Sequence, residues 1–207
     1  MPRVLNSRIR GAWDQFVRPV GRTIARTGLS PNAITVAGLL IQVVVAYLIV
    51  DGALLAAGLV AIAAGVADLL DGAVAKARGV ESPFGALFDS TTDRLSDALL
   101  FIPIAWLYGV DPDIAANDEP WVAAVALTAL VFSFLVSYVK ARAESLGFDC
   151  NVGFAERFER LAVMIAGLVF GIVPVTVVLL TLLTFGTFVK RMGHVYAQAR
   201  AGGRSVA

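Results

Sequence analysis

The sequence predicts an all-α integral membrane protein with six transmembrane helices, preceded by an N-terminal interfacial amphipathic helix. Three observations predict this fold class. Hydrophobic residues make up 58% of the 207-residue chain and charged residues only 16%. The apolar residues come in long runs rather than in amphipathic patterns, as bilayer-spanning helices require. All 17 lysines and arginines fall on one side of the resulting topology, as expected for a multi-pass protein.

Residues 1–30 form a juxtamembrane segment that is too polar and too rich in arginine for a signal peptide. Apolar residues recur among its arginines at helical spacing, namely Val4, Ile9, Trp13, Phe16, Val17, Val20 and Ile24. This pattern predicts a helix that lies on the surface of anionic lipid. A disordered basic tail is the alternative reading of the same composition.

Six apolar runs follow, and they define one membrane domain over residues 31–193. Ser30 is expected to cap the first helix and Pro31 to occupy its first position. We expect the spans at residues 32–50, 53–76, 85–109, 121–141, 157–173 and 174–192. Residues 194–207 then form a cytoplasmic tail. There is no internal repeat and no low-complexity linker.

The basic residues orient the bundle, because short cytoplasmic loops are enriched in lysine and arginine. Those beyond the N-terminal segment are Lys76, Arg78, Arg94, Lys140, Arg142, Arg157, Arg160, Lys190, Arg191, Arg200 and Arg204. The opposite loops hold only acidic charges, at Asp51, Asp111, Asp113, Asp118 and Glu119. We therefore expect a multi-pass protein of the plasma membrane with both termini on the cytoplasmic side. No nucleic-acid partner is expected.

Four aspartates on the second and third spans are the candidate site. Asp68 and Asp71 lie three residues apart and Asp89 and Asp93 four apart, so each pair shares a helical face. Carboxylates are costly in a membrane segment and require a function or a partner. Their oxygens select hard cations such as Mg²⁺, Mn²⁺ or Ca²⁺, and two metals about 4 Å apart form a clamp for phosphoryl displacement. The alternative is ion pairing with nearby basic residues, which explains one pair more readily than the ordered set.

Cys150 is the only cysteine, which excludes disulfide frameworks and zinc sites built from cysteines. It falls in a predicted cytoplasmic loop, where we interpret it as a spectator thiol. Gly72 and Gly85 flank the aspartates, and the absence of a side chain there allows close approach of a ligand.

The order of these residues resembles the signature of the CDP-alcohol phosphatidyltransferases, D-x2-D-G-x2-A-R-x8-G-x3-D-x3-D. The match runs from Asp68 to Asp93 and departs once, at Lys76, where the family has arginine. Lysine keeps the positive charge but lacks the planar, bidentate guanidinium. Arg78 is expected to point elsewhere on the helix, which makes it a poor substitute. A six-helix fold with a preceding interfacial helix, as in this family, covers nearly the whole chain.

The resemblance implies metal-assisted transfer from a CDP-lipid. It makes Asp68, Asp71 and Asp89 ligands of Mg²⁺ or Mn²⁺, with two ions per active site, and makes Asp93 a further ligand or the general base. The CDP-lipid would be bound by Pro31, Asn32, Thr35, Asp68, Gly72, Ala75, Lys76 and Gly85. For Pro31, Asn32 and Thr35, helix-start chemistry is an equally open reading.

A second group of polar residues ends the fourth span and begins the fifth. Ser137 and Lys140 lie three apart, and Arg157 and Arg160 repeat that spacing. Such a group is suited to bind a phosphate, although cytoplasmic anchoring is the alternative for the cations. The segments 137–144 and 153–160 resemble those of the actinobacterial phosphatidylinositol phosphate synthases, a branch of the same family.

That resemblance implies transfer of a phosphatidyl group from CDP-diacylglycerol to inositol 1-phosphate, with release of CMP. Ser137, Lys140, Arg160 and Arg191 would hold the acceptor phosphate, with Arg200 as the alternative to Arg191. The resemblance also implies a homodimer in membrane lipid. Two other functions remain open, a phosphatidylglycerophosphate synthase that uses glycerol 3-phosphate and, from a different class, a divalent-cation transporter.

Overall fold

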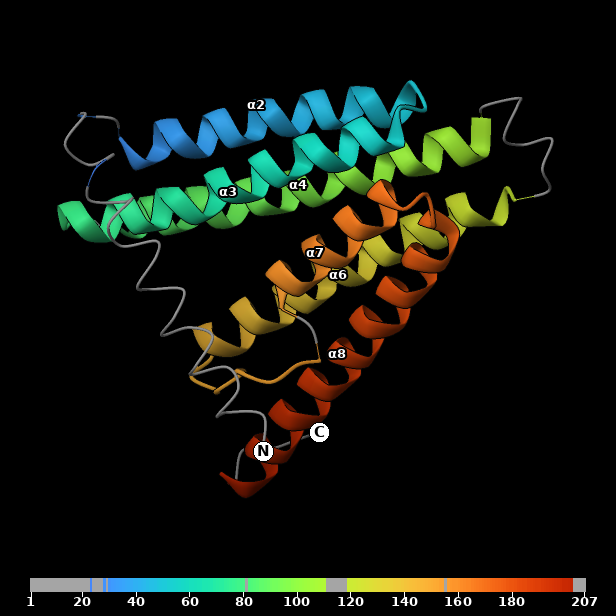
Figure 1. Ribbon diagram of the computed structural model, residues 1–207. Coiled ribbons are helices and arrows are strands. Elements are labelled where there is room, and N and C mark those ends of the chain that lie inside the picture. Colours follow the sequence, from blue (N-terminus) through green and yellow to red (C-terminus); the bar gives the residue numbers. More distant parts are fainter. Residues whose placement is uncertain are drawn as a thin grey trace. The chain divides into compact units, whose positions relative to one another are not determined.

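The computed structural model describes Thr23, Gly28 and residues 30–80, 82–110, 119–154 and 156–202, and every regular element in this part of the chain is a helix (Figure 1). The predicted interfacial helix lies outside the described residues, as do Asp111, Asp113 and Asp118 of the acidic loop. The helices are α2 (Pro31–Val50), α3 (Leu54–Arg78), α4 (Pro83–Val110), α6 (Trp121–Ser145), α7 (Arg157–Val169) and α8 (Val173–Ala201).

The predicted helix positions are confirmed to within a few residues at most ends. The start of α2 follows the expected cap, since the Ser30 hydroxyl accepts a hydrogen bond of 3.2 Å from the Ala33 N–H. The differences lie at the end of the chain. Helix α7 has 13 residues and α8 has 29. At a rise of 1.5 Å per residue α7 is only about 20 Å long.

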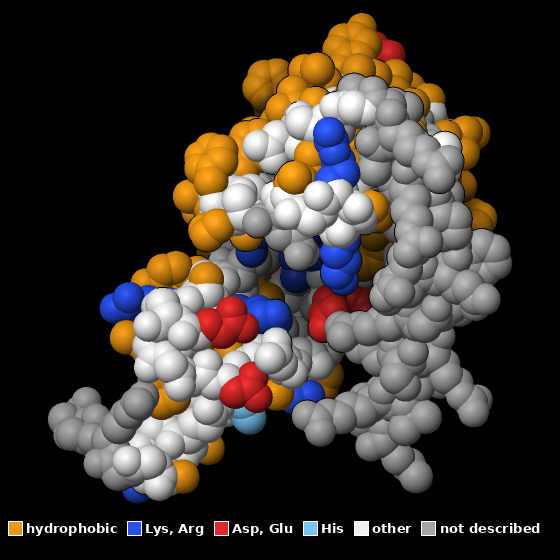
Figure 2. Space-filling model, turned by 90° about the vertical axis from the view of Figure 1, so that its left-hand side faces the viewer, with side chains coloured by type: hydrophobic (Ala, Val, Ile, Leu, Met, Phe, Trp, Pro, Cys, Tyr) orange, Lys and Arg blue, Asp and Glu red, His pale blue; other side chains and the backbone are white. Residues whose placement is uncertain are grey.

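In the part of the chain that the structure describes, four helices, α2, α3, α6 and α8, are long and apolar enough to cross a membrane. Helix α4 is long but carries four charged residues between Asp89 and Asp97, namely Asp89, Asp93, Arg94 and Asp97, and α7 is shorter than the roughly 30 Å hydrocarbon core. Large apolar side chains such as Leu40, Leu182 and Phe170 are 63%, 63% and 74% exposed, and Figure 2 shows hydrophobic side chains gathered at the top and upper left of the face in view. The protein is therefore a helical, multi-pass membrane protein.

The chain divides into two compact units. The first holds residues up to Val44 and residues Val60–Ser96, so it contains all four motif aspartates. Within it α2 and α3 approach closely, because a methyl group on Gly38 would lie only 3.2 Å from the Ala67 Cβ. Thr35 lies about one turn before Gly38 on α2, and Asp71 lies about one turn after Ala67 on α3. The close approach of the helices therefore brings Thr35 next to Asp71.

The second unit holds residues Val45–Leu59 and Asp97–Ala207. Helix α8 packs against both α6 and α7 in it (Figure 1). Phe132 of α6 meets Phe185 of α8 edge to face at 5.1 Å. Helices α7 and α8 meet where Gly167 has no side chain, since a methyl group there would lie 2.7 Å from Thr176 Cβ. The second group of polar residues singled out in the sequence belongs to this unit.

Candidate active site

Three of the four motif aspartates gather at one point. Oxygens of Asp68 on α3 and of Asp89 and Asp93 on α4 all lie within 4.8 Å of one another. Asp89 is exposed, whereas Asp68 and Asp93 are half-buried. Carboxylates this close repel one another unless a cation lies among them. A set made only of carboxylate oxygens fits a hard divalent cation.

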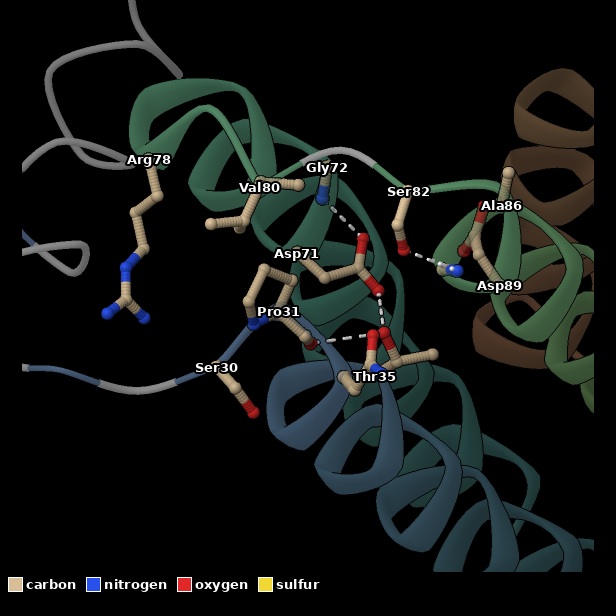
Figure 3. A pocket seen from close by; sticks show the side chains of 13 residues that line it. Ser30, Pro31, Thr35, Asp71, Gly72, Arg78, Val80, Ser82, Ala86 and Asp89 are labelled. Carbon is tan, nitrogen blue, oxygen red and sulfur yellow. Dashed lines mark hydrogen bonds between the residues drawn. The ribbon is translucent and has the colours of Figure 1, made fainter.

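Asp71 is not part of this group and makes different contacts. It is 5% exposed. Its Oδ2 accepts a hydrogen bond of 2.6 Å from the Thr35 hydroxyl, and its Oδ1 accepts one of 2.6 Å from the Gly72 N–H. Figure 3 shows the carboxylate held between these two donors. Because both oxygens are fixed, the orientation of Asp71 is set by α2 as well as by its own helix.

A cavity of about 490 Å³ lies beside Asp71 in the first unit. Asp89 belongs both to its wall and to the three-carboxylate group, so the cavity and that group adjoin. The lining residues are Ser30, Pro31, Asn32, Thr35, Asp71, Gly72, Ala75, Arg78, Val80, Ser82, Gly85, Ala86 and Asp89. The structure thus brings together most of the residues expected to bind the CDP-lipid. Asp68 and Lys76 are the two that do not line the cavity.

The expectation for Arg78 was wrong, because Arg78 lines the cavity. Helix α3 ends at this residue, so its side chain is not confined to the face that helical spacing assigns. Its Nη1 donates a hydrogen bond of 3.2 Å to the Gly28 carbonyl oxygen. An arginine therefore lines the cavity two residues after the position where the family signature has one.

Ser82 was missed by the sequence reasoning. Its hydroxyl accepts a hydrogen bond of 3.0 Å from the Gly85 N–H (Figure 3) and lies in the cavity wall. A serine directly before Pro83 is a helix-start signal that could have found it. The bond ties the first turn of α4, and with it the backbone that leads to Asp89.

The predicted acceptor residues come from three helices of the second unit. Ser137 and Lys140 lie on α6, Arg160 on α7 and Arg191 on α8, and α8 packs against the other two. Lys140 is 3.9 Å from Glu144 on its own helix. Arg191 is 7% exposed, and it donates hydrogen bonds to the carbonyl oxygens of Val152, at 2.9 Å, and Val136.

Asp97 is a second residue that the sequence reasoning missed. Its Oδ2 lies 3.5 Å from Nη2 of Arg160, and the two side chains are 15% and 7% exposed. The signal was available, since Asp97 continues the series Asp89, Asp93 at the same four-residue interval. A buried arginine with a carboxylate partner keeps its charge and has a defined orientation.

Comparison with known proteins identifies a matching family and several relatives. The family model for the CDP-alcohol phosphatidyltransferases matches residues 28–189. The archaetidylinositol phosphate synthase of Pyrococcus horikoshii is 35% identical over 90% of this chain and 94% of its own length. The phosphatidylinositol phosphate synthase of Mycobacterium tuberculosis is 37% identical over 76% of this chain and 71% of its own length.

Solved structures of the Mycobacterium tuberculosis enzyme share the fold. The structure with CDP-DAG bound has a TM-score of 0.78 at 33% identity, over 88% of this chain and 94% of that one. The structure in complex with manganese and citrate has a TM-score of 0.76 at 34% identity, over 87% and 88%. The resemblance found in the sequence is thereby confirmed, and the chain belongs to the CDP-alcohol phosphatidyltransferase family.

Proposed function

We propose that this enzyme transfers a phosphatidyl group from CDP-diacylglycerol to inositol 1-phosphate, giving phosphatidylinositol phosphate and CMP. The observation that carries the proposal is that Asp68, Asp89 and Asp93 form a three-carboxylate group beside the cavity. Asp89 belongs to this group and also lines the cavity. Support for the donor comes from the similar enzyme solved with CDP-DAG bound. Support for the acceptor comes from the relatives, whose names share an inositol phosphate product.

The donor occupies the cavity of the first unit in this proposal. The nucleotide lies along the backbone at Gly72, Ala75 and Gly85, where small residues permit close approach. Thr35 keeps Asp71 oriented toward it. The remaining donor contacts come from Pro31, Asn32, Asp68 and Lys76, and Arg78 adds a guanidinium at the cavity wall.

The aspartates hold Mg²⁺ or Mn²⁺, with two ions per site. Asp68, Asp71, Asp89 and Asp93 would supply the carboxylate oxygens that hold these ions. The manganese complex of the similar enzyme supports a divalent cation. When bound, such ions neutralise charge on the pyrophosphate and stabilise the leaving group.

Asp93 acts as the general base. A hydroxyl of the acceptor attacks the lipid-side phosphorus, an oxygen–phosphorus bond forms, the pyrophosphate bond breaks and CMP leaves. The hydroxyl proton passes to the Asp93 carboxylate, which must lie within hydrogen-bond reach in the bound complex. Arg94, whose Nη1 is 3.5 Å from Asp93 Oδ2, forms an ion pair with this carboxylate.

The acceptor phosphate is bound by Ser137, Lys140, Arg160 and Arg191. Asp97, whose Oδ2 lies 3.5 Å from Arg160 Nη2, holds the Arg160 guanidinium in place. Arg191 likewise uses Nε and Nη1 for backbone carbonyls and retains further donors. Charge-assisted bonds of this kind are the ones that recognise phosphate strongly.

In the membrane we propose six spans, with α4 and α7 joining the four long apolar helices, and an interfacial helix within residues 1–30. The membrane domain covers residues 31–193, and residues 194–207 are cytoplasmic. The distribution of lysine and arginine supports an active site and termini on the cytoplasmic face of the plasma membrane. The protein acts as a homodimer, as members of the family commonly do.

The test is acceptor choice. Purified protein in detergent with CDP-diacylglycerol and Mg²⁺ is offered inositol 1-phosphate, free inositol or glycerol 3-phosphate in separate reactions, and CMP release is measured. We expect release with inositol 1-phosphate alone. Release only with glycerol 3-phosphate would make the enzyme a phosphatidylglycerophosphate synthase, and release with free inositol would show that the acceptor phosphate is not recognised.

A further inference from the structure

The segment that joins α6 to α7 is held along its length by side chains of α8. We name residues Asp149–Phe154 the strap. The Asp149 N–H donates to Gln198 Oε1 at 3.0 Å, and Gln198 Nε2 donates to the Asp149 carbonyl at 2.6 Å. At the other end the Phe154 N–H donates to the Thr187 hydroxyl at 3.2 Å. Between them, Arg191 binds the Val152 carbonyl.

The spacing of these contacts is that of an extended chain lying antiparallel to a helix. From Asp149 to Val152 is three residues, or about 10 Å of extended chain at roughly 3.3 Å per residue. The matching step from Gln198 to Arg191 is seven residues, or about 10.5 Å of helix at 1.5 Å per residue. The next steps, Val152 to Phe154 and Arg191 to Thr187, agree equally well, at about 6.6 Å and 6 Å. The strap therefore has a fixed register on α8.

Two glycines make this close docking possible. A methyl group on Gly153 would lie 3.0 Å from Thr187 Cγ2, and one on Gly186 would lie 3.3 Å from the Phe154 ring. The Phe154 ring also lies 4.5 Å from the Lys190 ammonium, within the range of a cation–π contact. Cys150, inside the strap, is 0% exposed. The strap is thus packed as well as hydrogen-bonded.

Helix α7 begins at Arg157, shortly after the strap in the sequence, and its first turn carries Arg160, the buried partner of Asp97. Anchoring the strap fixes where α7 begins, and so fixes the guanidinium proposed to bind the acceptor. Without the anchors, this non-helical segment would have to become ordered each time the acceptor bound. The loss of conformational entropy would then lower the affinity for the acceptor. Gln198 lies six residues beyond the last predicted span, so packing inside the membrane does not explain its contacts.

We propose that Gln198 and Thr187 are positioning residues for the acceptor: by fastening the strap to α8 they preorganise Arg160 and set the affinity for inositol 1-phosphate. The inference rests on the proposed function, because that function defines the acceptor. It assigns the cytoplasmic end of α8 a part in substrate binding, although neither Gln198 nor Thr187 contacts the reacting atoms.

The single cysteine provides a readout that does not depend on catalysis. Burial raises the pKa of the Cys150 thiol, and only the thiolate reacts, so Cys150 should react slowly with a small thiol reagent while the strap is docked. Loss of one hydrogen bond weakens docking by about 1 kcal/mol, which is roughly fivefold. Gln198→Ala removes two bonds to the strap. Thr187→Val removes one bond to the strap, together with the bond from its hydroxyl to the Leu183 carbonyl, while keeping the shape of the side chain. In both we expect several-fold faster modification of Cys150 in the ligand-free enzyme.

The kinetic readout separates positioning from general damage. In both variants the Michaelis constant for inositol 1-phosphate should rise several-fold, with kcat and the constant for CDP-diacylglycerol close to those of the wild type. Thr187→Ser should restore both readouts, since it returns the hydroxyl. Tyr196→Ala is the matched control, because Tyr196 lies on the same helix, is half exposed and has its ring against Arg200.

If the rate of Cys150 modification in both variants equals that of the wild type, Gln198 and Thr187 do not hold the strap on α8. If Cys150 is modified faster but the Michaelis constant for inositol 1-phosphate is unchanged, the strap does not set the affinity for the acceptor. A fall in kcat alone would lead to the same conclusion. If the wild type releases no CMP with inositol 1-phosphate, the proposed function fails and the inference about the acceptor fails with it. In that case Cys150 modification still decides whether Gln198 and Thr187 hold the strap.

Discussion

Three carboxylates from two helices share one small volume, and at the scale of single residues this arrangement is what most needs a function. Asp68, Asp89 and Asp93 have oxygens within 4.8 Å of one another, a distance at which negative charges oppose folding unless a cation compensates them. The three are therefore expected to contribute to cation affinity together, and the removal of one should weaken the site for the other two.

We predict that Asp68→Asn and Asp89→Asn raise the Mg²⁺ concentration needed for half-maximal CMP release and abolish transfer at low Mg²⁺, because each removes a negative ligand of similar shape. Asp93→Asn should instead retain CDP-lipid binding and lose the chemical step. A Mg²⁺ titration of CMP release, with nucleotide binding measured in parallel, checks both. Near wild-type turnover in Asp89→Asn at low Mg²⁺ would refute the assignment.

Thr35 makes a separate prediction, because its hydroxyl orients Asp71 at 2.6 Å. A hydrogen bond to a charged group contributes about 1.5–3 kcal/mol. Thr35→Val should therefore raise the Michaelis constant for CDP-diacylglycerol by roughly ten- to hundredfold. Thr35→Ser keeps the hydroxyl and should stay close to the wild type. Equal constants for the valine and serine variants would show that the bond does not serve the donor.

Arg160 and Asp97 test the acceptor side. Arg160→Lys keeps the charge but loses the planar fork, and we expect the Michaelis constant for inositol 1-phosphate to rise roughly ten- to hundredfold, with that for the donor unchanged. Lys140→Ala should act in the same direction. Asp97→Asn should raise the same Michaelis constant by a smaller factor, because it removes the ion pair with Asp97 but keeps the Arg160 guanidinium. A rise confined to the donor constant would assign these cations to the pyrophosphate instead.

At this scale the sequence predicted residue types better than partners. The spacing from Asp68 to Asp93 gave the cluster, since helix geometry is regular there. It did not separate Asp71 from the other three, because that depends on a contact with α2, which spacing within α3 cannot show. Arg78 was misjudged because helical periodicity does not hold at a helix end.

At the scale of elements, close helix contacts rest on glycine. Gly167 on α7 faces Thr176 on α8 across a gap with no room for a methyl group. The length of an apolar run predicts a helix, whereas such a contact depends on which residues face each other across two helices. The sequence therefore predicted both helices but neither their true lengths nor this contact, which holds the α7–α8 hairpin together.

We predict that Gly167→Ala lowers the thermal midpoint of the detergent-solubilised protein, because overpacking of a tight contact costs about 1–3 kcal/mol. The double variant Gly167→Ala/Thr176→Ala should recover most of the loss, since it removes the atoms that clash. Thr176→Ala alone is the control. If Gly167→Ala melts at the wild-type temperature, the two helices do not pack this closely.

At the scale of the whole molecule, the basic residues fix the expected orientation in the membrane. Cys150 is buried, so its labelling would not show on which side of the membrane it lies. The test therefore uses single cysteines introduced into a Cys150→Ala variant. A membrane-impermeant thiol reagent should label Asp51→Cys in intact cells and Ser145→Cys only after permeabilisation. Both positions are exposed. The opposite pattern would reverse the topology.

The central claim, that a phosphorylated inositol accepts the phosphatidyl group, is tested most directly by following the acceptor's own phosphorus. Inositol 1-phosphate labelled with radioactive phosphorus is incubated with the purified enzyme, CDP-diacylglycerol and Mg²⁺, and the lipid and aqueous phases are separated. We predict that the label enters the lipid in proportion to the CMP released, while the CMP itself carries none. If CMP is released and the label stays in the aqueous phase, inositol 1-phosphate is not the acceptor.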